Sequence, residues 1–253
     1  MLRAELAACA GFAAVVAYIL YRRRHPTQMP RTLTQADACA YCCHVRLSVK
    51  PERRADFLKA IAAVRAASLR GAAPRALSYI YGEDVSAPNV FHVHQAFESK
   101  ADFDAQMSLP HGSDFHAFLR SGPLAEKPVV AFMQTMPQSS RAPVLSGQGA
   151  SRGVLRCLNV RMTVRPERRD EFLRSILADQ AGTLANEPLA RAFVVGEDIH
   201  DHNTFYLHEQ YVGAAGFEAH KAAPHFAPWQ AFVDTEPFVG PLHVDFFDSI
   251  PSP

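Results

Sequence analysis

The sequence has almost no net charge and no long run of one sign. Its 26 lysine and arginine residues nearly balance 25 aspartate and glutamate residues, which leaves a formal net charge of +1. A protein that binds nucleic acid through the phosphate backbone needs a basic stripe, so this balance argues against nucleic acid as a partner. The lack of charged blocks also argues against a charged tail.

Cysteine is scarce and irregularly placed. An odd, uneven set is not typical of the disulfide framework of a secreted protein. The stretch CAYCCH, residues 39–44, lacks the second ligand pair of a zinc finger and has the wrong spacing for haem attachment. We therefore expect small buried thiols in a strand here. The five cysteines are Cys9, Cys39, Cys42, Cys43 and Cys157.

One long apolar run stands out at the N-terminus. Residues 6–21 read LAACAGFAAVVAYILY, and RRRH follows at 22–25. The run is slightly shorter than the roughly 20 residues of a typical transmembrane helix. Because the arginines follow it, the positive-inside rule predicts that the rest of the chain stays on the cytoplasmic side. We expect a single-pass membrane anchor, with an organelle membrane as one location, and an organelle-targeting peptide as the alternative.

Beyond this segment the chain repeats itself. VRLSVKPERRADFLKAI, from Val45, matches VRMTVRPERRDEFLRSI, from Val160. YGEDVSAPNVFHVHQAF, from Tyr81, matches VGEDIHDHNTFYLHEQY, from Val195. The stretch between the copies is rich in Pro, Ser and Gly, which predicts a loop. We therefore divide the chain into an anchor with its basic flank over residues 1–25, a linker over 26–39, a first repeat over 40–136, a second linker over 137–153 and a second repeat over 154–250.

Each repeat has the pattern of one α+β unit. Alternating apolar residues predict a strand over 42–49 and over 157–164, and Pro51 and Pro166 mark the start of a helix. A strand, a Gly-Glu-Asp turn, another strand, two short helices around a Pro-His break and a final strand follow. This is the β-α-β-β-α-β order of a ferredoxin-like unit. Helices cover one face of such a sheet, so we expect the two repeats to pack sheet to sheet as an intramolecular pseudo-dimer.

The second repeat also carries a family signature. HEQYVGAAGFEAHKAAPHFAPWQAFV, residues 208–233, resembles the motif of antibiotic biosynthesis monooxygenase domains: an acid, an aromatic residue two positions on, then F-x-x-H and P-H-F. The resemblance covers both repeats, is degraded in the first, and extends to small quinol monooxygenases. It implies a dimeric α+β barrel made covalent by fusion. It also implies oxygenation of a small aromatic or quinol-like substrate by dioxygen, without a metal or a bound organic cofactor.

Two side chains of this motif are the candidate catalytic pair. Period two places Glu209 on the same face of its strand as apolar residues, where a carboxylate needs a partner or a raised pKa. His220 lies one turn after Phe217 and should point to that face. A buried glutamate that orients a histidine is suited to general-base catalysis near neutral pH.

The first repeat supports this assignment. It has Gln95 where the second has Glu209, and Gln106 in place of His220. Two amides can satisfy each other's hydrogen bonds but cannot titrate near neutral pH. We therefore expect acid-base chemistry in the second repeat alone; the alternative is that both pairs merely link helix to strand.

Five further residues are candidates for substrate binding. Tyr211 or Asn159 could hydrogen-bond the developing oxygen species, and the pocket would be lined by His225, Phe217 and Trp229. His225 could equally serve only to begin a helix, and Trp229 could belong to the core. Haem-degrading relatives use an asparagine, a tryptophan and a histidine that neither repeat has complete. Three alternatives remain open: a carbonyl or enol isomerase that uses the same pair, a non-catalytic ligand-binding module, and a haem-binding module.

Overall fold

The computed structural model describes residues 39–71, 73–136 and 153–251. The predicted membrane anchor and nearly all of both predicted linkers lie outside these residues. In the part of the chain that is described, no helix has the length and apolar character needed to cross a membrane.

The first repeat has the predicted order of elements. Its long helix begins in a 3-10 turn at Pro51, whose ring fixes φ at a helical value. The elements are β1 Tyr41–Ser48, η2 Pro51–Arg53, α2 Arg54–Arg70, β2 Ser78–Asp84, β3 Val90–Phe97, α3 Lys100–Ser108, α4 Pro110–Arg120 and β4 Val129–Thr135.

The second repeat follows the same plan. Its 3-10 turn begins at Pro166, which matches Pro51. The elements are β5 Leu155–Thr163, η4 Pro166–Arg168, α5 Arg169–Asn186, β6 Ala190–Asp198, β7 Thr204–Val212, α6 Gly213–Lys221, α7 Phe226–Val233 and β8 His243–Ser249.

The eight strands of the described residues close into one antiparallel barrel in the order β1-β3-β2-β8-β5-β7-β6-β4. Each repeat contributes a four-stranded sheet. Two short seams join the sheets: β2 pairs with β8, with Gly82 opposite Ser249, and β4 pairs with β6, with Met133 opposite Asp198. The predicted pseudo-dimer is therefore confirmed, and it is closed by hydrogen bonds as well as by packing.

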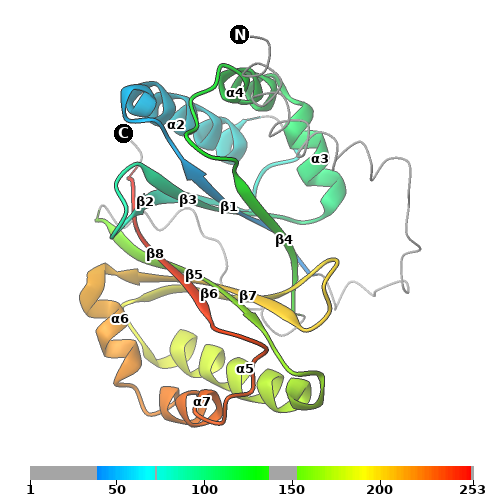
Figure 1. Ribbon diagram of the computed structural model, residues 1–253, viewed down its shortest axis with the longest axis vertical. Helices are drawn as coiled ribbons and strands as arrows, with labels where there is room; N and C mark the ends of the chain where they lie inside the picture. Colours follow the sequence, from blue (N-terminus) through cyan, green and yellow to red (C-terminus); the bar gives the residue numbers. More distant parts are fainter. Residues whose placement is uncertain (1–38, 72, 137–152, 252–253) are drawn as a thin grey trace.

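The helices cover the outside of the barrel. Figure 1 shows α2, α3 and α4 beyond the first sheet and α5, α6 and α7 beyond the second, with all strands between these two layers. Each sheet thus has a helix-facing side and a side that faces the barrel interior. Burial of apolar area on both sides is the main driving force for this arrangement.

The two faces of β7 have different neighbours. Phe205, Leu207 and Tyr211 belong to a core with residues of α5 and α7, such as Phe172. Tyr206, on the opposite face, packs among side chains of the first repeat inside the barrel. This alternation separates the polar groups of the second repeat into two distinct clusters.

Candidate functional site

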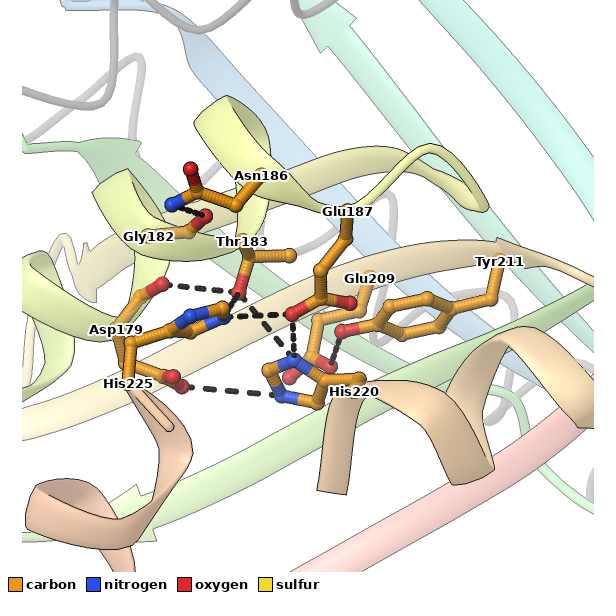
Figure 2. Close-up of polar contacts among 9 residues, drawn as sticks. All are labelled: Asp179, Gly182, Thr183, Asn186, Glu187, Glu209, Tyr211, His220 and His225. Carbon is orange, nitrogen blue, oxygen red and sulfur yellow. Dashed lines mark hydrogen bonds and ion pairs between the residues drawn. The ribbon is translucent and has the colours of Figure 1, made fainter. Parts of the chain in front are cut away.

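Seven polar side chains of the second repeat meet on the helix-facing side of its sheet (Figure 2). They come from α5 and the residue after it, from β7, and from the α6–α7 region. All seven are buried or partly buried. The cluster consists of Asp179, Thr183, Glu187, Glu209, Tyr211, His220 and His225.

Helix α5 supplies one side of the cluster. Asp179 and Thr183 lie one turn apart on its inner face, and the Thr183 hydroxyl donates to the backbone carbonyl of Asp179 at 2.9 Å. Glu187 directly follows the helix as its C-cap residue, with its backbone N–H bonded to the Thr183 carbonyl. The helix end therefore fixes where the Glu187 carboxylate lies.

Glu187 holds two imidazoles with a single oxygen. Its Oε1 lies 2.8 Å from His220 Nδ1 and 2.6 Å from His225 Nε2. An ionised carboxylate only accepts hydrogen bonds, so both imidazole nitrogens donate to it. His220 then carries its proton on Nδ1, which leaves a lone pair on Nε2, 3.8 Å from Asp179 Oδ2. A carboxylate on one nitrogen and a free lone pair on the other is the arrangement of a general base.

Glu209 has a different partner from the one expected. We predicted that it orients His220, but its Oε2 accepts a hydrogen bond from the Tyr211 hydroxyl at 2.8 Å. Glu187, at the C-terminal end of α5, is the carboxylate that binds His220 Nδ1 and orients the ring. Burial raises the pKa of Glu209, and the nearby His220 imidazole partly offsets this rise.

Burial also raises the pKa of Asp179 and of Tyr211 in this cluster. It raises the pKa of Asp179 from 3.8 to about 8, and the charges of Glu209 and Glu187 add to the rise. The carboxyl of Asp179 is therefore mostly protonated at neutral pH and can donate a proton. Burial and the adjacent carboxylate also raise the pKa of Tyr211, which stays a neutral hydrogen-bond donor.

Two carboxyl oxygens in the cluster have no hydrogen-bond partner. These are Asp179 Oδ1 and Glu187 Oε2, both buried. An unsatisfied buried polar atom costs about 1–3 kcal/mol. Both oxygens can therefore interact with a ligand that enters the site.

The remaining residues predicted to bind substrate lie in three different places: the site itself, the core and the barrel interior. His225 and Phe217 are part of the site: His225 binds Glu187, and the Phe217 ring lies 5.7 Å from that of Tyr211. Trp229 belongs to the core, where it packs on Phe172 and Phe232. Its predicted role in binding is not supported by this position.

Asn159 lies on the wrong side of the sheet for the predicted role. Its Oδ1 binds His208 Nδ1 at 2.8 Å in the barrel interior. Alternation along β5 explains this, because Leu158 and Val160 face the helices and Asn159 between them must face the other way. Asn159 cannot share a ligand with Tyr211 across the sheet.

The first repeat lacks all but one of the titratable groups of this cluster. Gln106, which replaces His220, donates to the Pro74 carbonyl and accepts from His111 Nε2 at 2.7 Å. His111 is the counterpart of His225 and is the one titratable member retained. Sequence alignment puts Val64, Ser68 and Ala72 at the positions of Asp179, Thr183 and Glu187.

Asp179 and Glu187 were therefore missed by sequence reasoning, although a signal existed. Asp179 lies three residues after Ile176 and seven after Phe172, on the apolar face of its helix. The same comparison of repeats that selected His220 would have selected both acids.

The donor set could also hold a divalent cation. Asp179, His220 and His225 each offer one ligand atom, and these atoms lie within 4.8 Å of one another. Two imidazoles and a carboxylate suit several first-row metals. The cluster thus has the chemistry of an acid-base site and of a possible metal ligand set.

Comparison with known proteins identifies the fold. The structure is similar to a proposed monooxygenase from Lactobacillus acidophilus, with a TM-score of 0.65 and 15% identity over 83% of this chain and 93% of that chain. A proposed monooxygenase from Fusobacterium nucleatum has a TM-score of 0.68 and 15% identity over 84% and 93%. An anthrone oxidase-like protein has a TM-score of 0.56 and 16% identity over 85% and 92%. At such identities the likeness shows the fold alone.

Sequence comparison identifies the family. No curated protein matches the chain. The sequence model of the family "Antibiotic biosynthesis monooxygenase" matches residues 40–117 and residues 156–231, one match in each repeat. Together these matches cover more than half of the chain, which therefore belongs to the antibiotic biosynthesis monooxygenase family as a tandem fusion of two of its domains.

Proposed function

We propose that the second repeat is a monooxygenase site that oxidises a quinol, phenol or enol with dioxygen. The observation that carries this proposal is the His220–Glu187 hydrogen bond of 2.8 Å beside a carboxyl, Asp179, whose pKa is raised to about 8. A base and a neutral acid thus lie together in a buried site.

The reaction starts with proton transfer. His220 Nε2 takes the hydroxyl proton of the substrate, and Glu187 stabilises the imidazolium that forms. The resulting anion is a better one-electron donor than the neutral phenol or enol. It passes an electron to dioxygen, and the two radicals combine so that a C–O bond forms at a carbon that bears hydrogen. The imidazolium returns its proton to the new peroxide.

Loss of water completes the reaction. His220 removes the hydrogen on the oxidised carbon while the O–O bond breaks, and Asp179 protonates the departing hydroxide. One oxygen atom of dioxygen ends in a carbonyl and the other in water, so the substrate has lost two hydrogens and gained one oxygen. Proton transfer from His220 to Asp179, over the 3.8 Å between Nε2 and Oδ2, restores both groups.

The substrate must displace side chains to reach this site. His220 is 2% exposed and Asp179 1% exposed. The partly buried rings of Phe217 and Phe226 lie 6.3 and 5.0 Å from the His220 ring. They provide an apolar, aromatic contact for the ligand.

Oxygen uptake with a panel of quinols, polyphenols and anthrones tests the proposal. With ¹⁸O₂ we expect one labelled oxygen in the product. His220→Gln, which installs the residue of the first repeat, should abolish uptake. His111→Gln makes the same change at a non-catalytic position of the first repeat and should leave it intact. Uptake by His220→Gln at the rate of the unmodified protein would refute the assignment.

An enol isomerase is the second candidate, because the same base and neutral acid can move a proton between carbon and oxygen. Turnover without oxygen separates the two. An isomerase keeps its rate under nitrogen, whereas the monooxygenase stops.

A further inference from the structure

A second polar cluster lies inside the barrel, on the opposite side of the sheet from the site described above. It centres on His94 in β3 and His208 in β7, which occupy equivalent positions in the two repeats. Their rings stack with centroids 3.8 Å apart and planes 3° from parallel. The pseudo-twofold axis of the barrel therefore passes between the two rings.

A third histidine joins this pair from the first repeat alone. His44 in β1 places its Nε2 3.0 Å from His94 Nδ1, and its ring lies 5.9 Å from that of His208. The equivalent residue of the second repeat is Asn159. The three imidazoles each offer one nitrogen, and these nitrogens lie within 4.8 Å of one another.

The cluster has an unused ligand atom. His94 is fully buried, yet its Nε2 has no hydrogen-bond partner. If His94 donates to His44 through Nδ1, the orphan Nε2 carries a lone pair; otherwise it carries an unpaired N–H. Either state is costly in a protein interior, and ligation of His94 by an ion would reorganise this bond.

The other two histidines are prepared as neutral ligands. Asn159 Oδ1 accepts from His208 Nδ1, so the lone pair of His208 is on Nε2, where it meets the Gln210 amide at 2.9 Å. A hydrogen bond that fixes the tautomer of a ligand is typical of metal sites. All three imidazoles are buried, with 7% of His44 and 0% of His94 and His208 exposed, and burial favours the uncharged ring that a metal ion binds.

We propose that His44, His94 and His208 bind one late first-row divalent ion, such as Zn²⁺, Co²⁺, Ni²⁺ or Cu²⁺, inside the barrel. Imidazole nitrogen is a preferred ligand of these ions. The ligands come from both repeats, so the ion cross-links the two halves. Each lone pair lies in the plane of its own ring, and the planes of His94 and His208 are 3° from parallel, so one ion cannot meet both lone pairs head-on. Ion binding therefore turns one ring and opens the Gln210 contact.

This site could not be predicted from sequence motifs, because its ligands lie far apart along the chain. His44 ends the CAYCCH stretch, which lacks a second ligand pair nearby. The partners come from β3 and from β7 of the other repeat. His44 and His94 are opposite each other on paired strands of the first repeat, and His208 joins them only when the barrel closes. The proposed metal site does not depend on the proposed oxygenase activity.

Metal loading during folding tests the proposal, because the closed barrel would admit an ion slowly. The full chain is unfolded with a chelator, refolded with Zn²⁺ or Co²⁺, passed through gel filtration and analysed for bound metal. We expect about one tightly held ion per chain, a cobalt d–d spectrum, and a melting temperature higher than that of the metal-free protein.

His44→Asn is the decisive variant. Asparagine already occupies the equivalent position in the same barrel, so the change should be tolerated, and near-ultraviolet circular dichroism checks this. The variant should lose the ion, the cobalt spectrum and the metal-induced rise in melting temperature.

Two control variants assign the ion to this cluster. His220→Gln and His92→Gln remove ligands from the two other groups of the described residues that could hold an ion, and both should keep it. Absence of bound metal in the unmodified protein would overturn the proposal. Full retention of the ion in His44→Asn would also overturn it. So would loss of the ion in His220→Gln alone, which would place the ion between Asp179, His220 and His225. If His44→Asn misfolds, His208→Gln replaces it, with the same outcomes.

Discussion

Glu187 orients His220 from the position directly after α5, through a hydrogen bond of 2.8 Å to Nδ1. Glu187 lies outside the family motif, and the pairing joins the C-terminal end of α5 to α6. It gives the proposed base a carboxylate partner that the first repeat lacks.

Glu187→Gln should lower the rate of oxygen uptake by about 10²-fold, within the range that general acid-base catalysis contributes. The amide oxygen can still accept from Nδ1, so the imidazole keeps its place, but it does not stabilise the imidazolium. Steady-state rates should show the loss mainly in kcat. Glu218→Gln, on the exposed face of α6, is the control and should behave as the parent. An unchanged kcat in Glu187→Gln would exclude it as the positioning residue.

Asp179→Asn should stabilise the protein, and more so at pH 8 than at pH 5. The pKa of Asp179 is about 8 in the folded protein against a usual value of 3.8. The folded state thus binds the proton more tightly than the unfolded state, and stability is lost as the pH rises from about 4 through 8. The amide has no charge to bury, so the difference in melting temperature should grow across this interval. The same change at exposed Asp170 is the control, and an equal difference at both pH values would contradict the assignment.

Gly182→Ala should destabilise the protein although alanine favours helices by about 1 kcal/mol. A Cβ at Gly182 would lie 2.5 Å from His225 Cγ, so the imidazole would leave Glu187. Overpacking of this kind costs about 1–3 kcal/mol. The first repeat has Ala67 at the equivalent position, and Ala67→Gly should also destabilise. His225→Gly removes the ring and also the Cβ of residue 225, which would lie 2.7 Å from the new methyl group, so in this background Gly182→Ala should become stabilising. A persistent loss in denaturant unfolding would place the clash elsewhere.

Removal of metal should affect the two polar clusters differently. If His220 works as a base, a chelator should leave oxygen uptake per folded molecule unchanged. The same treatment during refolding should lower the melting temperature if the barrel holds an ion. Loss of uptake that returns only with added metal would show that Asp179, His220 and His225 act as ligands and would contradict the base mechanism.

The fold could be predicted because the chain contains two copies of one unit, which can be compared with each other. Matching Pro51 with Pro166, and the Gly-Glu-Asp turns with each other, reveals two copies of a unit too small to cover both faces of its sheet. Closure of the barrel then follows from burial of the uncovered faces. The seams between β2 and β8 and between β4 and β6 involve few residues and have no distinctive pattern.

The site could be predicted only in part, because strand alternation and helical spacing place a side chain on a face without naming its partner. They brought Glu209 and His220 to one side of the sheet. Glu187 rather than Glu209 is the partner of His220 for two reasons: α5 is long enough to bring Glu187 to the imidazole, and Glu209 accepts its hydrogen bond from the Tyr211 hydroxyl instead. Alternation along β5 predicts that Asn159 faces away from Leu158 and Val160, so its assignment to the substrate site conflicted with the strand pattern.

The seams of the barrel join parts of one chain. A barrel built from identical subunits carries every mutation twice, so a change that suits one half must also be tolerated by the other. Here a mutation alters one half only, which allows His44 and Asn159 to differ at matched positions and allows one half to lose its acids. Such a barrel also remains whole on dilution, since no subunit can dissociate from it.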